Sequence, residues 1–155
     1  MAFLYNMVKK SSSPNGDRTV MWMALAMFIS YMASDPLLSI AFGYNMLDSS
    51  FAYVIWAGSD LLMLAVIWLV AHQKTFLEVP AKLYIYTGLL VNTSLFLGMY
   101  YDINYTYTGE WWFWDFYTIT VNLMDMMMLI ALFCNKDFLG LVKLYRSMRG
   151  QTKLA

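Results

Sequence analysis

The chain has 155 residues, of which 61% are hydrophobic and 13% charged, and its formal net charge at pH 7 is zero. A soluble domain of this size cannot bury so much apolar surface, so the composition excludes an ordinary soluble domain and indicates a membrane protein. The balanced charge gives no reason to expect nucleic-acid binding, and the single cysteine, Cys134, excludes a disulfide within this sequence.

Four long apolar runs predict four transmembrane helices. They lie at about 19–44, 51–73, 81–101 and 111–134. The first run is longer than the apolar core of a cleaved signal peptide, and none alternates as the strands of a membrane barrel do. The predicted fold is all-α: a polytopic membrane protein with an antiparallel four-helix bundle over 19–135. The bundle follows an N-terminal segment, 1–18, and precedes a basic tail, 136–155.

The basic residues predict the orientation of the bundle. All ten Lys and Arg precede the first run, lie between the second and third, or follow the fourth. The other two loops carry acidic residues instead: Asp48, Asp102 and Glu110. Because positive loops stay in the cytoplasm, we expect both termini there, in a cell inner or plasma membrane.

The C-terminal tail has its own helical pattern. Apolar residues recur at helical spacing from Asp137 to Arg149, while Lys143 and Arg146 fall to the side. This pattern predicts a basic amphipathic helix that lies on the anionic lipids of the inner leaflet. A helix that docks on another protein is the alternative.

Polar residues inside the predicted spans are the candidate functional residues. Asp35 in the first span and Asp60 in the second come to similar depth in an antiparallel pair. The fourth span carries polar residues on one stripe of the helix, and the third brings an amide to a comparable level. We expect a polar layer in the middle-to-outer part of the bundle, formed by Asp35, Asp60, Asn92, Asn122 and Asp125. The outer mouth of this site is predicted at Asp115 and Thr118.

Carboxylates at this depth need compensation, because an ionised carboxylate in the bilayer centre costs several kcal/mol. No Lys or Arg lies at that depth in the chain. The remaining solutions are protons shared with neighbouring polar groups, a bound cation, or a basic group from another subunit or ligand. The sequence therefore predicts a proton- or small-cation-responsive transporter or channel subunit, either a homo-oligomer or part of a larger membrane complex.

The same polar residues also have structural interpretations. Asp35 precedes Pro36, where a disrupted helix frees backbone groups, and Asp115 is near enough to the outer interface to be hydrated. Asn92 and Asn122 are residue types that join helices by hydrogen bonds. These interpretations favour a structural or assembly subunit, and the small size with a basic tail is also compatible with a pore-forming lysis protein of the holin type.

Enzyme and metal signatures are absent from the sequence. It has no phosphate-binding glycine loop, nucleophile elbow or HExxH motif, so it gives no support to the common enzyme classes. With one histidine, His72, and one cysteine, it offers no zinc site. No cofactor is predicted.

Overall fold

The computed structural model describes the backbone of residues 2–12, 18–43, 50–106 and 111–149. Within these ranges the side chains of 3, 9–12 and 34–43 are not described. The elements are α1 (Ala2–Ser12), α2 (Arg18–Gly43), α3 (Phe51–Ala71), α4 (Pro80–Tyr101), the π-helical turn η1 (Asp102–Thr106), α5 (Trp112–Cys134) and α6 (Leu141–Met148). Every regular element of the described residues is helical, which confirms the predicted all-α class.

Three helices are long and apolar enough to cross a membrane: Phe51–Ala71, Pro80–Thr106 and Trp112–Cys134. They correspond to the second, third and fourth runs of the sequence. Helix α2 covers the first run, but the apolar stretch found within its described part, Arg18–Ala33, is shorter. The three apolar helices indicate a membrane protein, and the first span stays a prediction.

Helix α4 is the most buried of the three membrane-competent helices. Half of its apolar window is buried inside the molecule, against 22% for the windows of α3 and α5. Helices α3 and α5 both pack against α4, whereas α2 packs mainly against α3 and α1 and contacts α5 over a small area. Among the described residues, the contact between α2 and α5 is therefore the smallest of these helix contacts.

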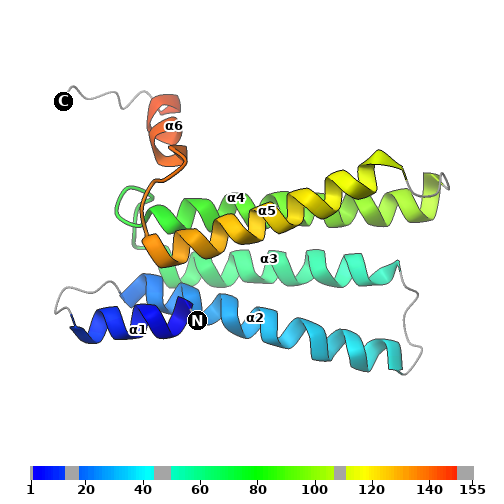
Figure 1. Cartoon of the computed structure of the whole chain (residues 1–155), viewed down its shortest axis with the longest axis horizontal. Helices are drawn as coiled ribbons and strands as arrows, with labels where there is room; N and C mark the ends of the chain where they lie inside the picture. Colours follow the sequence, from blue (N-terminus) through cyan, green and yellow to red (C-terminus); the bar gives the residue numbers. More distant parts are fainter. Residues whose placement is uncertain (1, 13–17, 44–49, 107–110, 150–155) are drawn as a thin grey trace.

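One end of the bundle carries α1, the α3–α4 connection and α6, and the other carries η1 (Figure 1). At the first end, Pro80 starts α4, a position that suits a proline because its missing N–H needs no helical partner. Lys82, which is buried, donates from Nζ to the carbonyl oxygens of Ala71 and Lys74 at 2.7 and 2.8 Å. These bonds join the first turn of α4 to the last residue of α3 and to the connection that follows it.

The N-terminal segment forms α1, which packs against α2 and α5. Buried Asn6 donates from Nδ2 to the carbonyl oxygens of Ala2 and Leu132, both at 2.9 Å. The ring of Tyr5 lies 5.4 Å from that of Phe133. The segment is thus joined to the bundle.

The tail helix begins later than its sequence pattern predicts. The pattern starts at Asp137, but Gly140 has a φ of +76° and the helix runs only from Leu141 to Met148. Asp137 accepts hydrogen bonds from the backbone N–H groups of Val142 and Lys143, both at 3.1 Å. The Asp137 carboxylate therefore caps the N-terminus of α6, although the residue itself lies outside the helix.

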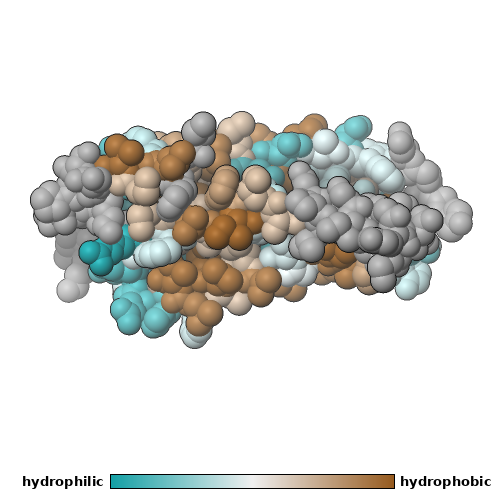
Figure 2. Space-filling view, turned by 90° about the horizontal axis from the view of Figure 1, so that it is seen from below, coloured by the Kyte–Doolittle hydropathy of each residue, from teal (hydrophilic) through white to brown (hydrophobic). Residues whose placement is uncertain are grey.

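Much of the surface is apolar. Brown, apolar side chains cover the middle of the face shown in Figure 2. On the membrane-competent helices, large apolar side chains such as Leu62, Leu69, Ile119 and Leu123 are between 60 and 67% exposed. Exposed apolar side chains on these helices fit contact with lipid.

Candidate functional site

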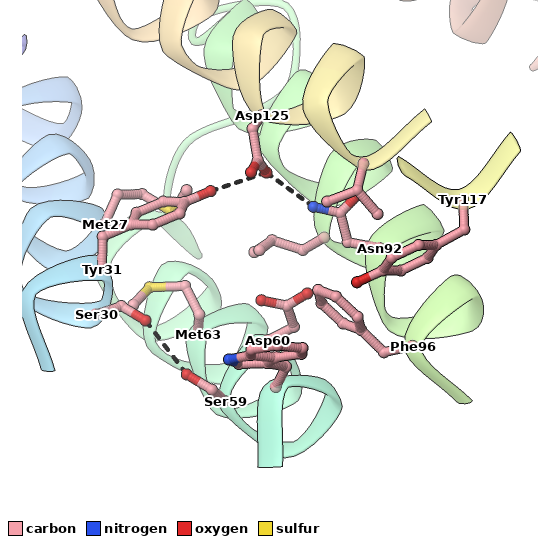
Figure 3. Close-up of a pocket in the computed structure, with 13 residues that line it drawn as sticks. Met27, Ser30, Tyr31, Ser59, Asp60, Met63, Asn92, Phe96, Tyr117 and Asp125 are labelled. Carbon is pink, nitrogen blue, oxygen red and sulfur yellow. Dashed lines mark hydrogen bonds between the residues drawn. The ribbon is translucent and has the colours of Figure 1, made fainter. Parts of the chain in front are cut away.

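Helices α2 to α5 enclose a pocket of about 290 Å³ that we call the acidic pocket (Figure 3). Asp60 of α3 and Asp125 of α5 line it, and their carboxylates point into it from opposite sides of the view. Asn92 of the central helix α4 also lines it. No Lys, Arg or His is among the described residues of the lining.

Asp125 is held by two donors. The Tyr31 hydroxyl donates to Oδ1 of Asp125 at 2.9 Å, and Nδ2 of Asn92 donates to the same oxygen at 2.8 Å. These bonds tie α2 and α4 to α5 across the pocket. They fix the carboxylate but provide no positive charge.

Two buried oxygens of the pocket lack a hydrogen-bond partner among the described residues. They are Oδ2 of Asp60 and Oδ1 of Asn92, and Asn92 as a whole is only 3% exposed. Beside Asp60, the hydroxyls of Ser30 and Ser59 lie 3.4 Å apart and join α2 to α3. Both unpartnered atoms are hydrogen-bond acceptors. A donor would satisfy either of them, and a proton or a cation would also offset the charge of the Asp60 carboxylate.

Four aromatic rings form a closed set on α3, α4 and α5 that we call the aromatic collar: Tyr53, Trp56, Phe96 and Tyr117. The ring centroids of neighbours are 5.4 Å (Tyr53–Trp56), 5.6 Å (Trp56–Phe96), 6.0 Å (Phe96–Tyr117) and 5.8 Å (Tyr117–Tyr53) apart. Three of the rings, all but that of Tyr53, line the acidic pocket. Trp56 precedes Asp60 by one helical turn, so the collar lies toward the η1 end of the pocket.

A second pocket of about 390 Å³ lies on the other side of Tyr31 and Asp125. It shares Met27, Tyr31 and Asp125 with the acidic pocket, and the rest of its lining is almost entirely apolar. The hydrogen bond between Tyr31 and Asp125 therefore lies on the boundary between the two pockets.

The structure brings together three of the five residues expected in the polar layer: Asp60, Asn92 and Asp125. Asn122 lines only the second pocket, is exposed, and donates to the carbonyl oxygen of Thr118 in its own helix at 2.7 Å. Asp35 falls within α2, but its side chain lies outside the described residues.

The residues expected at the outer mouth do not line the acidic pocket. Asp115 is exposed, and exposed Thr118 donates from its hydroxyl to the carbonyl oxygen of Trp114 at 2.9 Å. With Asn122 they form an exposed polar stripe on α5. Helical periodicity predicts that these residues share one face of α5, but it does not tell whether that face points into the bundle or away from it.

Sequence reasoning missed the hydrogen-bond partners of two carboxylates, Asp125 and Asp102. It did not consider Tyr31, although a phenolic hydroxyl at the depth of a buried acid is a ready donor. It also assigned Asp102 to an outer loop without predicting a partner. The side chain is buried and accepts from the indole N–H groups of Trp111 and Trp114 at 3.1 to 3.2 Å. In both cases the feature that could have indicated the bond is an aromatic side chain with an O–H or N–H group at the same depth of the bundle as an acid.

Comparisons with known proteins identify no relative. No protein-family model matches the chain, and neither a curated protein nor a solved structure is significantly similar to it.

Proposed function

We propose that the chain is a small multi-pass membrane protein whose acidic pocket binds protons or small cations, as a subunit of a transporter or channel. The observation that carries this proposal is the placement of Asp60, Asn92 and Asp125 around one pocket with no basic side chain in its described lining. Two unpartnered buried acceptors add to it. Carboxylates in such surroundings hold a proton or a cation, since bare charge is costly there.

The proposal includes a topology of four spans with both termini in the cytoplasm. Its support is the distribution of Lys and Arg in the sequence together with the position of α1, the α3–α4 connection and α6 at one end of the bundle. In this arrangement Lys143 and Arg146 of α6 face the anionic inner leaflet.

The polar stripe on α5 supports assembly with a partner. Asp115, Thr118 and Asn122 are exposed on a helix that is apolar enough to span a membrane. Polar groups on a lipid-facing surface are unfavourable, so a second copy or another subunit is expected to cover them. This observation also favours the second candidate function, a structural subunit of a larger membrane complex.

Flux measurements in proteoliposomes test the first candidate. We expect the wild-type protein to pass protons or monovalent cations under an imposed potential, and Asp60→Asn and Asp125→Asn each to reduce the flux by about tenfold or more. Glu78→Gln is the control, because this exposed carboxylate lies on the α3–α4 connection, outside both the pocket and the polar stripe of α5. Wild-type flux equal to that of empty liposomes, or flux that both substitutions leave intact, would refute the transport proposal.

The mass of the purified protein in mild detergent tests the second candidate. A homo-oligomer that survives Asp60→Asn and Asp125→Asn is expected from the transport proposal. A dedicated partner that is lost on either substitution would instead make these carboxylates assembly contacts.

A further inference from the structure

The acidic pocket combines two kinds of wall. Carboxylates from α3 and α5 provide negative charge, while Trp56, Phe96 and Tyr117 of the aromatic collar provide ring surface. The Tyr117 hydroxyl also points toward the pocket in Figure 3. A ligand that satisfies both walls has a positive charge and apolar substituents.

The unpartnered acceptors indicate where the charge lies. Nδ2 of Asn92 is held by Asp125, so its buried Oδ1 is left without a partner among the described residues, as is Oδ2 of Asp60. An alkylammonium ion with N–H groups donates to acceptors of this kind, and a quaternary ammonium ion offsets the charge of the Asp60 carboxylate by contact. The part of the pocket beside Asp60 and Asn92 therefore suits the positively charged nitrogen of a ligand.

The aromatic collar indicates the rest of the ligand. Ring faces attract cations whose charge is spread over alkyl groups, and this attraction is strongest for indole. A dehydrated metal ion needs a shell of several oxygen ligands. Among the described residues, no cluster of three or more His, Cys, Asp or Glu side chains is placed to hold a metal ion.

The pocket size agrees with a small organic ligand. Its volume of about 290 Å³ is close to the lower end of the roughly 300–1,000 Å³ of small-molecule sites. We infer that the acidic pocket binds a small alkylammonium ion, with its charge between Asp60 and Asp125 and its alkyl groups against the aromatic collar. This inference rests on the proposed function and names the cation.

Binding of radiolabelled tetramethylammonium to the full chain in dodecyl maltoside tests the inference. We expect saturable binding that excess butylammonium displaces and that sodium or potassium chloride at the same ionic strength does not. Trp56→Leu, which keeps an apolar side chain but removes the indole, is expected to weaken binding about fivefold or more. Asp60→Asn is expected to weaken it about tenfold or more.

The matched control is Trp68→Leu on the same helix. Trp68 is 57% exposed and lies three helical turns beyond Trp56, outside the pocket, so its substitution should leave the affinity unchanged. If Trp56→Leu does not give a monodisperse protein, Trp56→Phe replaces it, and an affinity between those of the wild type and Asp60→Asn is then expected. Equal affinities for Trp56→Leu and wild type would overturn the inference.

Two comparisons separate the remaining outcomes. If protons or alkali cations cross proteoliposomes but tetramethylammonium does not bind, the proposed function stands and the alkylammonium inference fails; if neither occurs, both fail.

The ammonium group that the pocket binds can also belong to a lipid headgroup. Phosphatidylcholine carries such a headgroup and galactolipids do not. Weaker tetramethylammonium binding in phosphatidylcholine nanodiscs than in galactolipid nanodiscs would therefore identify the lipid as the source, and equal binding would identify a free ammonium ion.

Discussion

At the scale of single residues, Asp125 organises three helices through one oxygen. Its Oδ1 accepts from Tyr31 on α2 and from Asn92 on α4, while the residue itself belongs to α5. A hydrogen bond to an acidic group contributes more than one between neutral groups, and removing a donor leaves the acceptor partly unsatisfied. Because the described residues of α2 have little other contact with α5, the Tyr31 bond is one of the few links between these two helices.

Tyr31→Phe tests this role. It removes the hydroxyl donor and keeps the ring, so we expect the free energy of unfolding to fall by about 1–3 kcal/mol. The measurement is denaturant titration in mild detergent, followed by helical circular dichroism. In an Asp125→Ala background the same substitution should have a smaller effect, since the acceptor is already gone.

Tyr86→Phe is the matched control for the loss of a hydroxyl. The Tyr86 hydroxyl is buried without a hydrogen-bond partner among the described residues, so its removal should leave stability unchanged or raise it. Equal destabilisation by both substitutions would mean that the bond between Tyr31 and Asp125 contributes nothing specific.

At the scale of helices, the packing of α4 on α5 depends on a glycine. A Cβ placed on Gly88 would lie 2.5 Å from Sδ and 2.6 Å from Cγ of Met128, which is only 1% exposed. The absence of a side chain thus lets a large residue of α5 lie against the backbone of α4. Close approach at small residues is a common basis of helix packing in membranes.

Gly88→Ala is therefore expected to destabilise the protein by about 1–3 kcal/mol through overpacking. Gly58→Ala is the control, because a Cβ at that helical glycine meets nothing within 4 Å. We expect it to be neutral or slightly stabilising, since alanine favours helix. The thermal unfolding midpoints in detergent give the comparison, and an unchanged midpoint for Gly88→Ala would contradict this account of the contact.

The attachment of α6 depends on another carboxylate. Asp137 accepts from the Tyr84 hydroxyl at 2.7 Å as well as from the N–H groups of Val142 and Lys143, and the ring of Phe138 stacks on that of Tyr84 at 4.7 Å. Burial raises the pKa of Asp137, but these hydrogen bonds and the charge of Lys143 outweigh it and hold the pKa below its usual value. The ionised form is thus the one that α6 needs.

The lowered pKa sets the direction of a pH effect. The stabilisation from Asp137 is fully present above the pKa of the unfolded chain, about 3.9, and is lost as the pH falls through the lower pKa of the folded state. Asp137→Asn should remove this dependence and lower amide protection of Val142 and Lys143 by about fivefold at neutral pH, equivalent to about 1 kcal/mol. Hydrogen exchange, corrected for intrinsic rates, measures it.

Glu78→Gln is the control for this effect. Glu78 lies at the same end of the molecule and also has a lowered pKa, because it accepts from the backbone N–H and hydroxyl of Thr75. Among the described residues its hydrogen bonds are with Thr75 and none is with α6, so its substitution should leave the protection of Val142 and Lys143 unchanged. A similar loss in both variants would point to a general effect of charge.

At the scale of the whole molecule, the predicted orientation places the end of α5 at the cytoplasmic face. Cys134, the only cysteine, is the last residue of α5 and is exposed. In intact cells a membrane-impermeant maleimide should leave it unlabelled, and permeabilisation should expose it to labelling.

Thr106→Cys in a Cys134→Ser background is the control from the opposite end. Thr106 is exposed at the end of η1, so this variant should be labelled in intact cells. Labelling of Cys134 but not of the residue-106 variant would reverse the topology. Labelling of both would contradict an antiparallel bundle that crosses the membrane.

The helices themselves were predictable from the sequence. Continuous apolar runs give α3, α4 and α5 almost to the residue, because the length and hydropathy of a span are local properties of the chain. The start of α6 was not predictable in the same way. It depends on the positive φ of Gly140 and on bonds from Asp137, which the apolar periodicity does not register.

The sequence by itself determined that this chain is helical and apolar enough for a membrane. It singled out as costly polar residues Asp35, Asn122 and a further three, Asp60, Asn92 and Asp125. Only the tertiary structure decided that these three share one pocket, that Asn122 lies outside it, and that Tyr31 and the aromatic collar complete it. The physical reason is that periodicity fixes which residues share a face of one helix. The rotation of each helix about its axis is set by packing against its neighbours.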